Sequence, residues 1–143
     1  MELTTLFPHQ PSKDPGLLHP LALAYLGDAV YEVFVRQYLI SRPNNKPNHM
    51  HREATSFVSA KAQCRSIEAL MPMLSEEEID IYKRGRNAKS ATSPKNTDVV
   101  VYRISTGFEC LIGYLYLRGR WDRLRELMEW TIGEKGMNHG TES

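Results

Sequence analysis

Two acidic residues stand alone in apolar, helix-like stretches, and they are the first candidates for chemistry. Asp28 lies within 21–32, which reads Leu-Ala-Leu-Ala-Tyr-Leu-Gly-Asp-Ala-Val-Tyr-Glu, and Glu109 lies within 105–117. Because a carboxylate is costly to remove from water, each should be hydrogen-bonded, paired with a charge, bound to a metal or placed beside a wet cleft. For Asp28 taken alone, the alternative is that it lies on the solvated edge of an amphipathic helix and has no functional role.

Glycines next to both acids would let the two helices approach each other. Gly27 precedes Asp28, and Gly113 lies one helical turn beyond Glu109 on the same face. Helices that cross at such small residues come close enough for their carboxylates to meet. The spacing therefore predicts a pair of carboxylates contributed by two distant segments of the chain.

A carboxylate pair of this kind suits a hard divalent cation. Mg²⁺ is commonly held by one or two carboxylates together with water and phosphate oxygens, and we predict Asp28 and Glu109 as its ligands. A cation at such a site makes water a better nucleophile and stabilises the charge that develops on a phosphodiester. The alternative is structural, with the two acids as ion-pair partners of Arg36 or Arg103.

The segment 83–97 is basic, with five Lys or Arg residues and no acidic one, although the net charge of the chain is only +1. Its basic, amide and hydroxyl side chains are typical of contacts with phosphates and sugars, and a lysine ahead of a helix N-terminus adds to an anion site there. A solvated connection between helices is the alternative. We predict nucleic-acid contacts from this segment and from one residue of an earlier helix: Arg84, Arg86, Asn87, Lys89, Ser90, Lys95, Asn96, Thr97 and Lys61.

The spacing of apolar residues predicts helices and no strand of useful length, so we expect an all-α fold in a single domain. Ser75 and Glu78 form a capping box for one helix, and Asn96 or Thr97 can cap the next. The expected helices are 20–40, 48–71, 75–85, 98–117 and 121–132. We expect a partly ordered lead-in over 1–19, a helical domain over 20–133 and a flexible tail over 134–143.

Composition limits the class of protein. The 143 residues are 41% hydrophobic and 24% charged, which is typical of a soluble globular domain, and no apolar run approaches the roughly 18 residues that span a bilayer. Cys64 and Cys110 lie in helical patterns, so we expect reduced thiols and a cytoplasmic protein. No group of Cys and His residues has the spacing of a zinc site.

The chain resembles the ribonuclease III family. Residues 23–30 (Leu-Ala-Tyr-Leu-Gly-Asp-Ala-Val) resemble its signature helix, and residues 108–113 (Phe-Glu-Cys-Leu-Ile-Gly) resemble its second acidic motif. Residues 84–90 and 94–98 resemble the compact Mini-III group, which has no separate domain that binds double-stranded RNA. The match covers most of the chain, from about 21 to 117.

The resemblance implies an all-helical homodimer that hydrolyses phosphodiesters in double-stranded RNA with Mg²⁺, for which Mn²⁺ is a substitute. It further implies maturation of precursor 23S ribosomal RNA in a bacterium. Asp28 and Glu109 carry over as the catalytic, metal-linked acids. The signature helix implies a dimer interface made by Tyr25, Leu26, Ala29 and Val30.

Two carboxylates of the family pattern are missing. Longer members have a Glu four residues before the signature Asp and an Asp three residues before the second-motif Glu, and this chain has Ala24 and Thr106 there. Asp98 is either a substitute acid or a helix-terminal residue favoured by the helix dipole. The alternatives to an active nuclease are a catalytically silent RNA-binding or scaffold domain and a helical protein-interaction module with structural acids.

Overall fold

The computed structural model describes residues 6–89 and 98–142, with side chains as far as residue 133. Within these residues the chain is helical and has no strand, which confirms the all-α prediction. The elements are η1 (Pro15–Leu17), α2 (Pro20–Ile40), α3 (Pro47–Val58), α4 (Ala60–Leu70), η2 (Met71–Met73), α5 (Glu76–Asn87), α6 (Val99–Leu117) and α7 (Trp121–Glu142). Among the described residues, none of these helices is long and apolar enough to span a bilayer.

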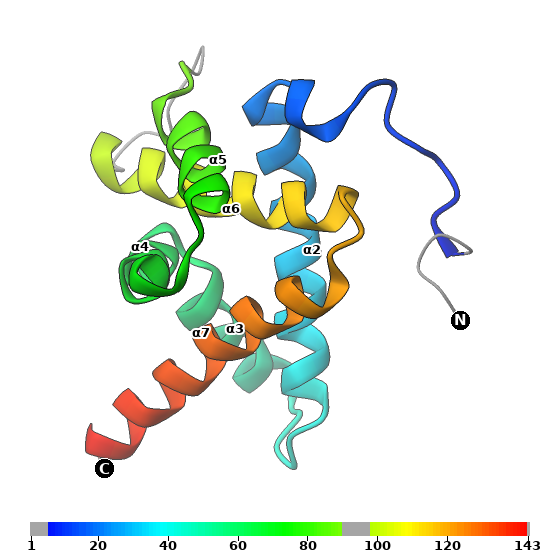
Figure 1. Ribbon diagram of the computed structural model, residues 1–143. Coiled ribbons are helices and arrows are strands. Elements are labelled where there is room, and N and C mark those ends of the chain that lie inside the picture. Colours follow the sequence, from blue (N-terminus) through cyan, green and yellow to red (C-terminus); the bar gives the residue numbers. More distant parts are fainter. Residues whose placement is uncertain (1–5, 90–97, 143) are drawn as a thin grey trace.

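Helices α2 and α6 form the centre of the molecule, where α6 runs across α2 and the other helices pack around the crossing (Figure 1). The crossing is very close. A Cβ atom added to Gly27 would lie 1.8 Å from the carbonyl oxygen of Glu109, and one added to Gly113 would lie 2.0 Å from the carbonyl oxygen of Leu23. Glycine is therefore required at both positions, and the predicted close approach of the two segments is confirmed.

The core surrounds this crossing and is filled mainly by aliphatic and aromatic side chains. Tyr31 of α2 packs edge-on against Phe108 of α6, with ring centroids 5.0 Å apart, and its hydroxyl is hydrogen-bonded to Thr131 of α7 at 2.8 Å. The largest fully buried apolar side chains are Leu23, Tyr31, Val35, Ile67, Leu70, Phe108, Leu111, Ile112, Leu115 and Leu127. These residues come from α2, α4, α6 and α7, so four helices share one core.

Helix ends differ from the predicted ones where a local hydrogen bond competes with helix continuation. The predicted helix 48–71 is divided at Ser59, whose extended backbone (φ −63°, ψ 156°) ends α3 while its side chain accepts a hydrogen bond from the Ala62 amide and caps α4. Helix α6 is capped by Asp98 rather than by Asn96 or Thr97, which lie outside the described residues. The capping box at the start of α5 is present as predicted.

The last helix and the end of α5 are longer than predicted. Helix α5 continues past 85 to Asn87, and α7 continues past 132 to Glu142. Glycine is compatible with helix at these positions, and Gly85 lies inside α5 facing Cys110, where a Cβ atom added to the glycine would lie 2.5 Å from the Cβ of Cys110. By contrast Gly119, with φ +71°, does end a helix, since this left-handed backbone favours glycine.

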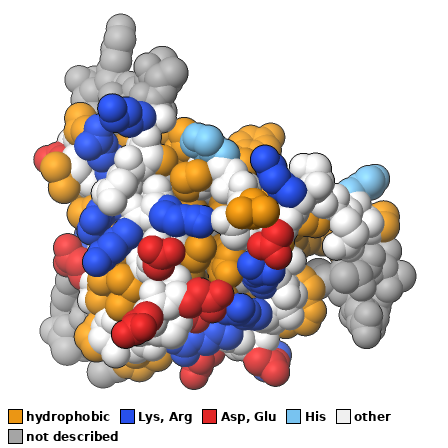
Figure 2. Space-filling model, turned by 45° about the horizontal axis from the view of Figure 1, so that its top comes forward, with side chains coloured by type: hydrophobic (Ala, Val, Ile, Leu, Met, Phe, Trp, Pro, Cys, Tyr) orange, Lys and Arg blue, Asp and Glu red, His pale blue; other side chains and the backbone are white. Residues whose placement is uncertain are grey.

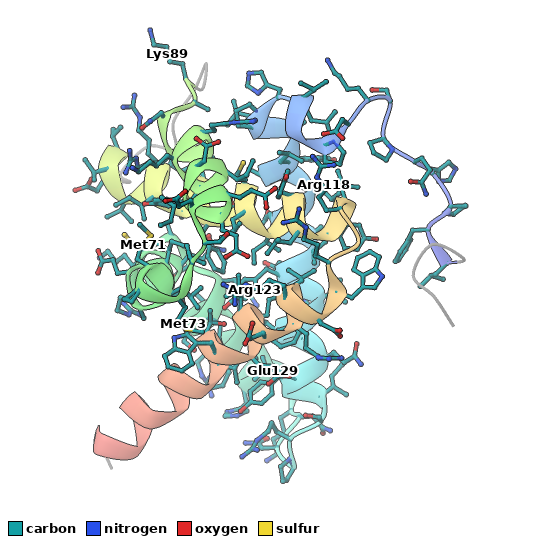
Figure 3. The ribbon with its side chains drawn as sticks, in the orientation of Figure 1. Met71, Met73, Lys89, Arg118, Arg123 and Glu129 are labelled. Carbon is teal, nitrogen blue, oxygen red and sulfur yellow. The ribbon has the colours of Figure 1, made fainter. Side chains whose placement is uncertain are left out.

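The N-terminal lead-in is tied to the helical body by two arginines. Arg84 of α5 donates two hydrogen bonds to the carbonyl oxygen of Gly16, at 2.9 and 2.7 Å. Arg118, at the end of α6 (Figure 3), makes a two-pronged contact with the carboxylate of Asp14 at 2.8 and 2.7 Å. Residues 14–17 therefore have a defined place on the surface formed by α5 and α6.

A buried ion pair fastens α7 to the start of α5. Arg123 donates to both carboxylate oxygens of Glu78 at 2.8 Å and to the carbonyl oxygen of Met73 at 2.7 Å. Glu78 is only 3% exposed. The hydrogen bonds from Arg123 hold the pKa of this carboxyl below its ordinary value, despite its burial.

Candidate active site

Asp28 and Glu109 meet at the crossing of α2 and α6. Gly27 and Gly113 bring the two backbones together, and the two acids lie beside this contact, on α2 and α6 respectively. Glu109 is half-buried, whereas Asp28 is exposed. The site is therefore open to solvent on the side of α2 and closed on the side of α6.

The electrostatics of Glu109 show that the two acids act on each other. Burial, the charge of Asp28 and a hydrogen bond with Asp28 together raise the pKa of Glu109 to about 8, and the charge of Glu32 adds to the same effect. A hydrogen bond from Gln63 opposes the shift. At neutral pH Glu109 therefore holds a proton when no cation is bound, because burial and the adjacent carboxylate both disfavour its charged form.

The basic side chains considered as structural partners do not neutralise this pair. Arg36 instead pairs with Glu32 at 2.9 Å, one helical turn beyond Asp28. Arg103 is exposed, and within the described part of the chain no ion pair is formed by Asp28, Glu109 or Arg103. The pair thus keeps an uncompensated negative charge once both groups are ionised.

The donor set fits a hard divalent cation that keeps part of its water shell. The described residues contain no group of three or more His, Cys, Asp or Glu side chains suited to a metal. Mg²⁺ is held in many sites by only one or two carboxylates, with water and phosphate oxygens as the remaining ligands. Asp28 and Glu109 match that smaller protein contribution.

The two positions that differ from the family pattern supply no further ligand. Ala24 is 5% exposed and presents only a methyl group. Thr106 donates its hydroxyl to the carbonyl oxygen of Tyr102 at 2.9 Å. Both side chains therefore belong to the helix packing around the crossing.

Asp98 lies at the end of α6 that is distant from the pair. Its carboxylate accepts hydrogen bonds from the amides of Val100 and Val101 at 2.8 and 3.2 Å, so it caps the helix. Glu109 is eleven positions further along, which corresponds to roughly 16 Å at 1.5 Å per residue. The geometry supports the helix-terminal interpretation of Asp98 over that of a substitute acid.

Comparison with known proteins decides the family. A family profile described as "Ribonuclease III domain" matches residues 21–120. The chain belongs to the ribonuclease III family. It is 53% identical over 126 residues to the Mini-ribonuclease 3 of Enterococcus faecalis, which covers 87% of this chain and 96% of that protein.

Other relatives agree with this assignment to the Mini-III group. The Mini-ribonuclease 3 of Brevibacillus brevis is 52% identical over 118 residues, covering 82% of this chain and 88% of that protein. A crystal structure of a protein from Fusobacterium nucleatum superposes with a TM-score of 0.76 at 31% identity, covering 87% of this chain and 99% of that one. The ribonuclease III resemblance is confirmed, and the protein is an endoribonuclease of this family.

Of the nine residues predicted to contact RNA, four lie outside the described part of the chain and five lie on or next to α4 and α5. Ser90, Lys95, Asn96 and Thr97 lie outside the described residues. The exposed Lys61 lies on α4, and Lys89 follows the end of α5, where it points away from the body (Figure 3). Figure 2 shows further Lys and Arg side chains beside the grey segment at the top of the view.

The remaining predicted contacts are near the C-terminal end of α5, and some of them already have partners. The guanidinium of Arg84 is held by Gly16, as described above. Arg86 lies over the ring of Tyr82, 5.6 Å from its centroid, and donates to the side-chain oxygen of Asn87 at 3.1 Å. Asn87 and Lys89 are exposed and Arg86 is half-buried, so these three are placed to reach a ligand.

The predicted dimer residues follow the outer side of α2. Tyr25 is 85% exposed and Ala29 is exposed, whereas Leu26 and Val30 are half-buried. Val30 packs partly against the core.

Sequence reasoning missed two neighbours of the acidic pair, Glu32 and Gln63. Glu32 lies four residues after Asp28, which is a recognisable helical spacing for a shared face. Gln63 comes from α4, and its amide nitrogen donates to Glu109 at 3.5 Å. No local signal in the sequence connects Gln63 with Glu109, because the contact joins residues 46 positions apart.

Proposed function

We propose that this nuclease hydrolyses phosphodiesters in double-stranded RNA with Mg²⁺ held by Asp28 and Glu109. The observation that carries the proposal is the acidic pair itself. Glu109 is half-buried beside Asp28 and has no basic partner among the described residues, so the site lacks a counterion of its own. A divalent cation supplies that charge.

Each acid has a distinct role in this site. When bound, Mg²⁺ activates water for attack and stabilises the charge developing on the phosphate. Asp28, the exposed member, is the acid that solvent reaches. Glu109 is anchored by burial and by the close helix crossing, and it would have to lose its proton to hold a cation.

The RNA surface that we propose lies at the C-terminal end of α5. Arg86, Asn87 and Lys89 are accessible there, and Lys61 is accessible on α4. Double-stranded RNA is recognised mainly through its shape, phosphates and 2′-hydroxyls. Because such contacts are largely electrostatic, binding should weaken steeply as the salt concentration rises.

The proposed assembly is a homodimer through α2. Its outer side carries exposed apolar residues that share a stripe of the helix, with Tyr25 85%, Val33 63% and Ile40 61% exposed, and with Ala29 between them. A second copy of the chain would cover this stripe. We further propose a cytoplasmic location, which rests on the two free cysteines, and precursor 23S ribosomal RNA as the substrate, which rests on the resemblance to the Mini-III group.

The test is cleavage of a long RNA duplex in Mg²⁺ and in EDTA. We expect cleavage by the unmodified protein in Mg²⁺ only, and a fall of more than about 100-fold for Asp28→Asn and Glu109→Gln, since even an outer partner of a ligand is typically worth 10–100-fold. The control is Glu129→Gln, which removes an exposed acid from α7 (Figure 3). Full activity of either active-site variant would contradict the proposal, and duplex binding without cleavage in any divalent cation would favour a silent RNA-binding domain.

A further inference from the structure

A buried amide lies against the acidic pair. Gln63 is 1% exposed, although glutamine is usually found at protein surfaces. Its nitrogen Nε2 donates to Oε2 of Glu109 at 3.5 Å, across the contact between α4 and α6. Among the described residues Glu109 is its hydrogen-bond partner, so the side chain is directed at the site rather than at the surrounding core.

Burying this amide needs a reason, because an apolar side chain of similar size would fill the same space at lower cost. An amide removed from water without full hydrogen bonding destabilises a protein. Within the described part of the chain, the carbonyl oxygen Oε1 of Gln63 has no donor. Among the described residues, the side chain of Gln63 is thus hydrogen-bonded to a charged group of the site, which is unusual for a residue whose sole purpose is packing.

The chemistry of an amide explains why Gln63 differs from a basic residue at this position. A lysine or arginine would orient Glu109 but would also neutralise it, as Arg123 does for Glu78. A neutral donor can restrain one carboxylate oxygen and leave the negative charge available to a cation. The carboxylate of Glu109 then remains available on the side of the site where Asp28 lies.

We propose that Gln63 is a positioning residue, whose amide fixes the carboxylate of Glu109 in the orientation that binds the divalent cation. The inference rests on the proposed cation site at Asp28 and Glu109. It assigns to α4 a part in the active site that is separate from any contact of this helix with RNA. A restrained ligand binds a cation more tightly than a free one, because its orientation is not lost on binding.

The experiment is a calorimetric titration of the RNA-free full chain with Mg²⁺, together with the Mg²⁺ concentration that gives half-maximal cleavage. Gln63→Met keeps the length of the side chain and removes the hydrogen bond. We expect it to weaken Mg²⁺ binding about tenfold and to raise the half-maximal Mg²⁺ concentration by a similar factor. Gln37→Met is the matched control, since Gln37 is exposed on α2, and it should change neither value.

A second variant keeps the proposal testable if Gln63→Met does not fold. Gln63→Asn retains a neutral amide but is one methylene shorter, so it loses the reach to Glu109 and should also weaken Mg²⁺ binding. Unchanged Mg²⁺ affinity in a folded variant would overturn the role of Gln63, and so would the loss of the fold in both variants, because Gln63 would then act through the core. If the unmodified protein binds no Mg²⁺, the proposed cation site itself fails, which is a separate outcome.

Discussion

Two glutamates in this molecule lie on neighbouring helices, and their pKa values are shifted in opposite directions. Glu78 of α5 is almost fully buried and is held by both prongs of Arg123 at 2.8 Å, and its pKa is lowered. Glu109 of α6 is only half-buried and lies beside Asp28, and its pKa is raised to about 8. The more deeply buried group is therefore the one that stays ionised.

Burial raises the pKa of both carboxyls, but at Glu78 the hydrogen bonds from Arg123 outweigh it, whereas at Glu109 the charge of Asp28 adds to it. The guanidinium of Arg123, on α7, neutralises the carboxylate of Glu78 within the fold, so this ion pair is structural. Glu109 has an acidic neighbour, Asp28, and a neutral one, Gln63, so its charge remains to be matched from outside. A carboxylate without an internal cation is thus the clearest mark of a functional site in this structure.

The largest expected effect is a difference in stability between the variants Glu78→Gln and Glu109→Gln. Glu78→Gln removes the buried charge partner of Arg123, which among the described residues keeps only the exposed carboxylate of Glu126 at 2.6 Å, and should lower the free energy of unfolding by about 3 kcal/mol. Glu109→Gln removes a repulsion with Asp28 and should leave the free energy of unfolding unchanged or slightly higher. Chemical denaturation of both variants in EDTA measures the contrast. Equal losses of stability would show that both glutamates are structural.

A smaller effect is expected from forcing apart the helix crossing that brings Asp28 and Glu109 together. An added methyl group in Gly113→Ala would meet the carbonyl oxygen of Leu23 at 2.0 Å, so a backbone shift is needed, at a cost of about 1–3 kcal/mol. Cleavage should fall with stability, since the acids no longer meet. Gly133→Ala is the control, because nothing lies within 4 Å of the added atom; it should be neutral or stabilising. Wild-type cleavage by a folded Gly113→Ala would contradict the geometry.

A pH dependence of stability with opposite signs is expected for the two glutamates. Between the ordinary pKa of 4.5 and about 8, folded Glu109 keeps a proton that the unfolded chain has lost, so its contribution to stability falls as the pH rises through this range. Glu78 has a lowered pKa, so its contribution is present above pH 4.5 and is lost as the pH falls below it.

Melting curves recorded in EDTA across this pH range measure that dependence. Stability of the unmodified protein should decline towards pH 8, Glu109→Gln should flatten the decline, and excess Mg²⁺ should reverse it, since the cation replaces the proton. Glu129→Gln, which alters an exposed acid, should retain the slope. A Glu109→Gln profile that declines like the unmodified one would assign the slope to another group.

The sequence by itself determined the parts of this protein that depend on local pattern. The helices α2 and α6 were predictable from the spacing of their apolar residues, and the capping box of α5 from the separation of Ser75 and Glu78. Asp28 and Glu109 were recognisable as isolated acids beside glycines. Their meeting could be predicted because Gly27 and Gly113 each remove the side chain that would otherwise keep two helices apart.

Only the tertiary structure decided which charges are compensated. Arg123 reaches Glu78 across 45 positions, and Gln63 reaches Glu109 across 46. Arg84 lies against Gly16, 68 positions away. Contacts of this kind leave no periodicity in the chain, because each depends on how whole helices pack. A side chain's type and neighbours in sequence therefore indicate that it can carry a charge, whereas its neighbours in space decide whether that charge is compensated within the fold.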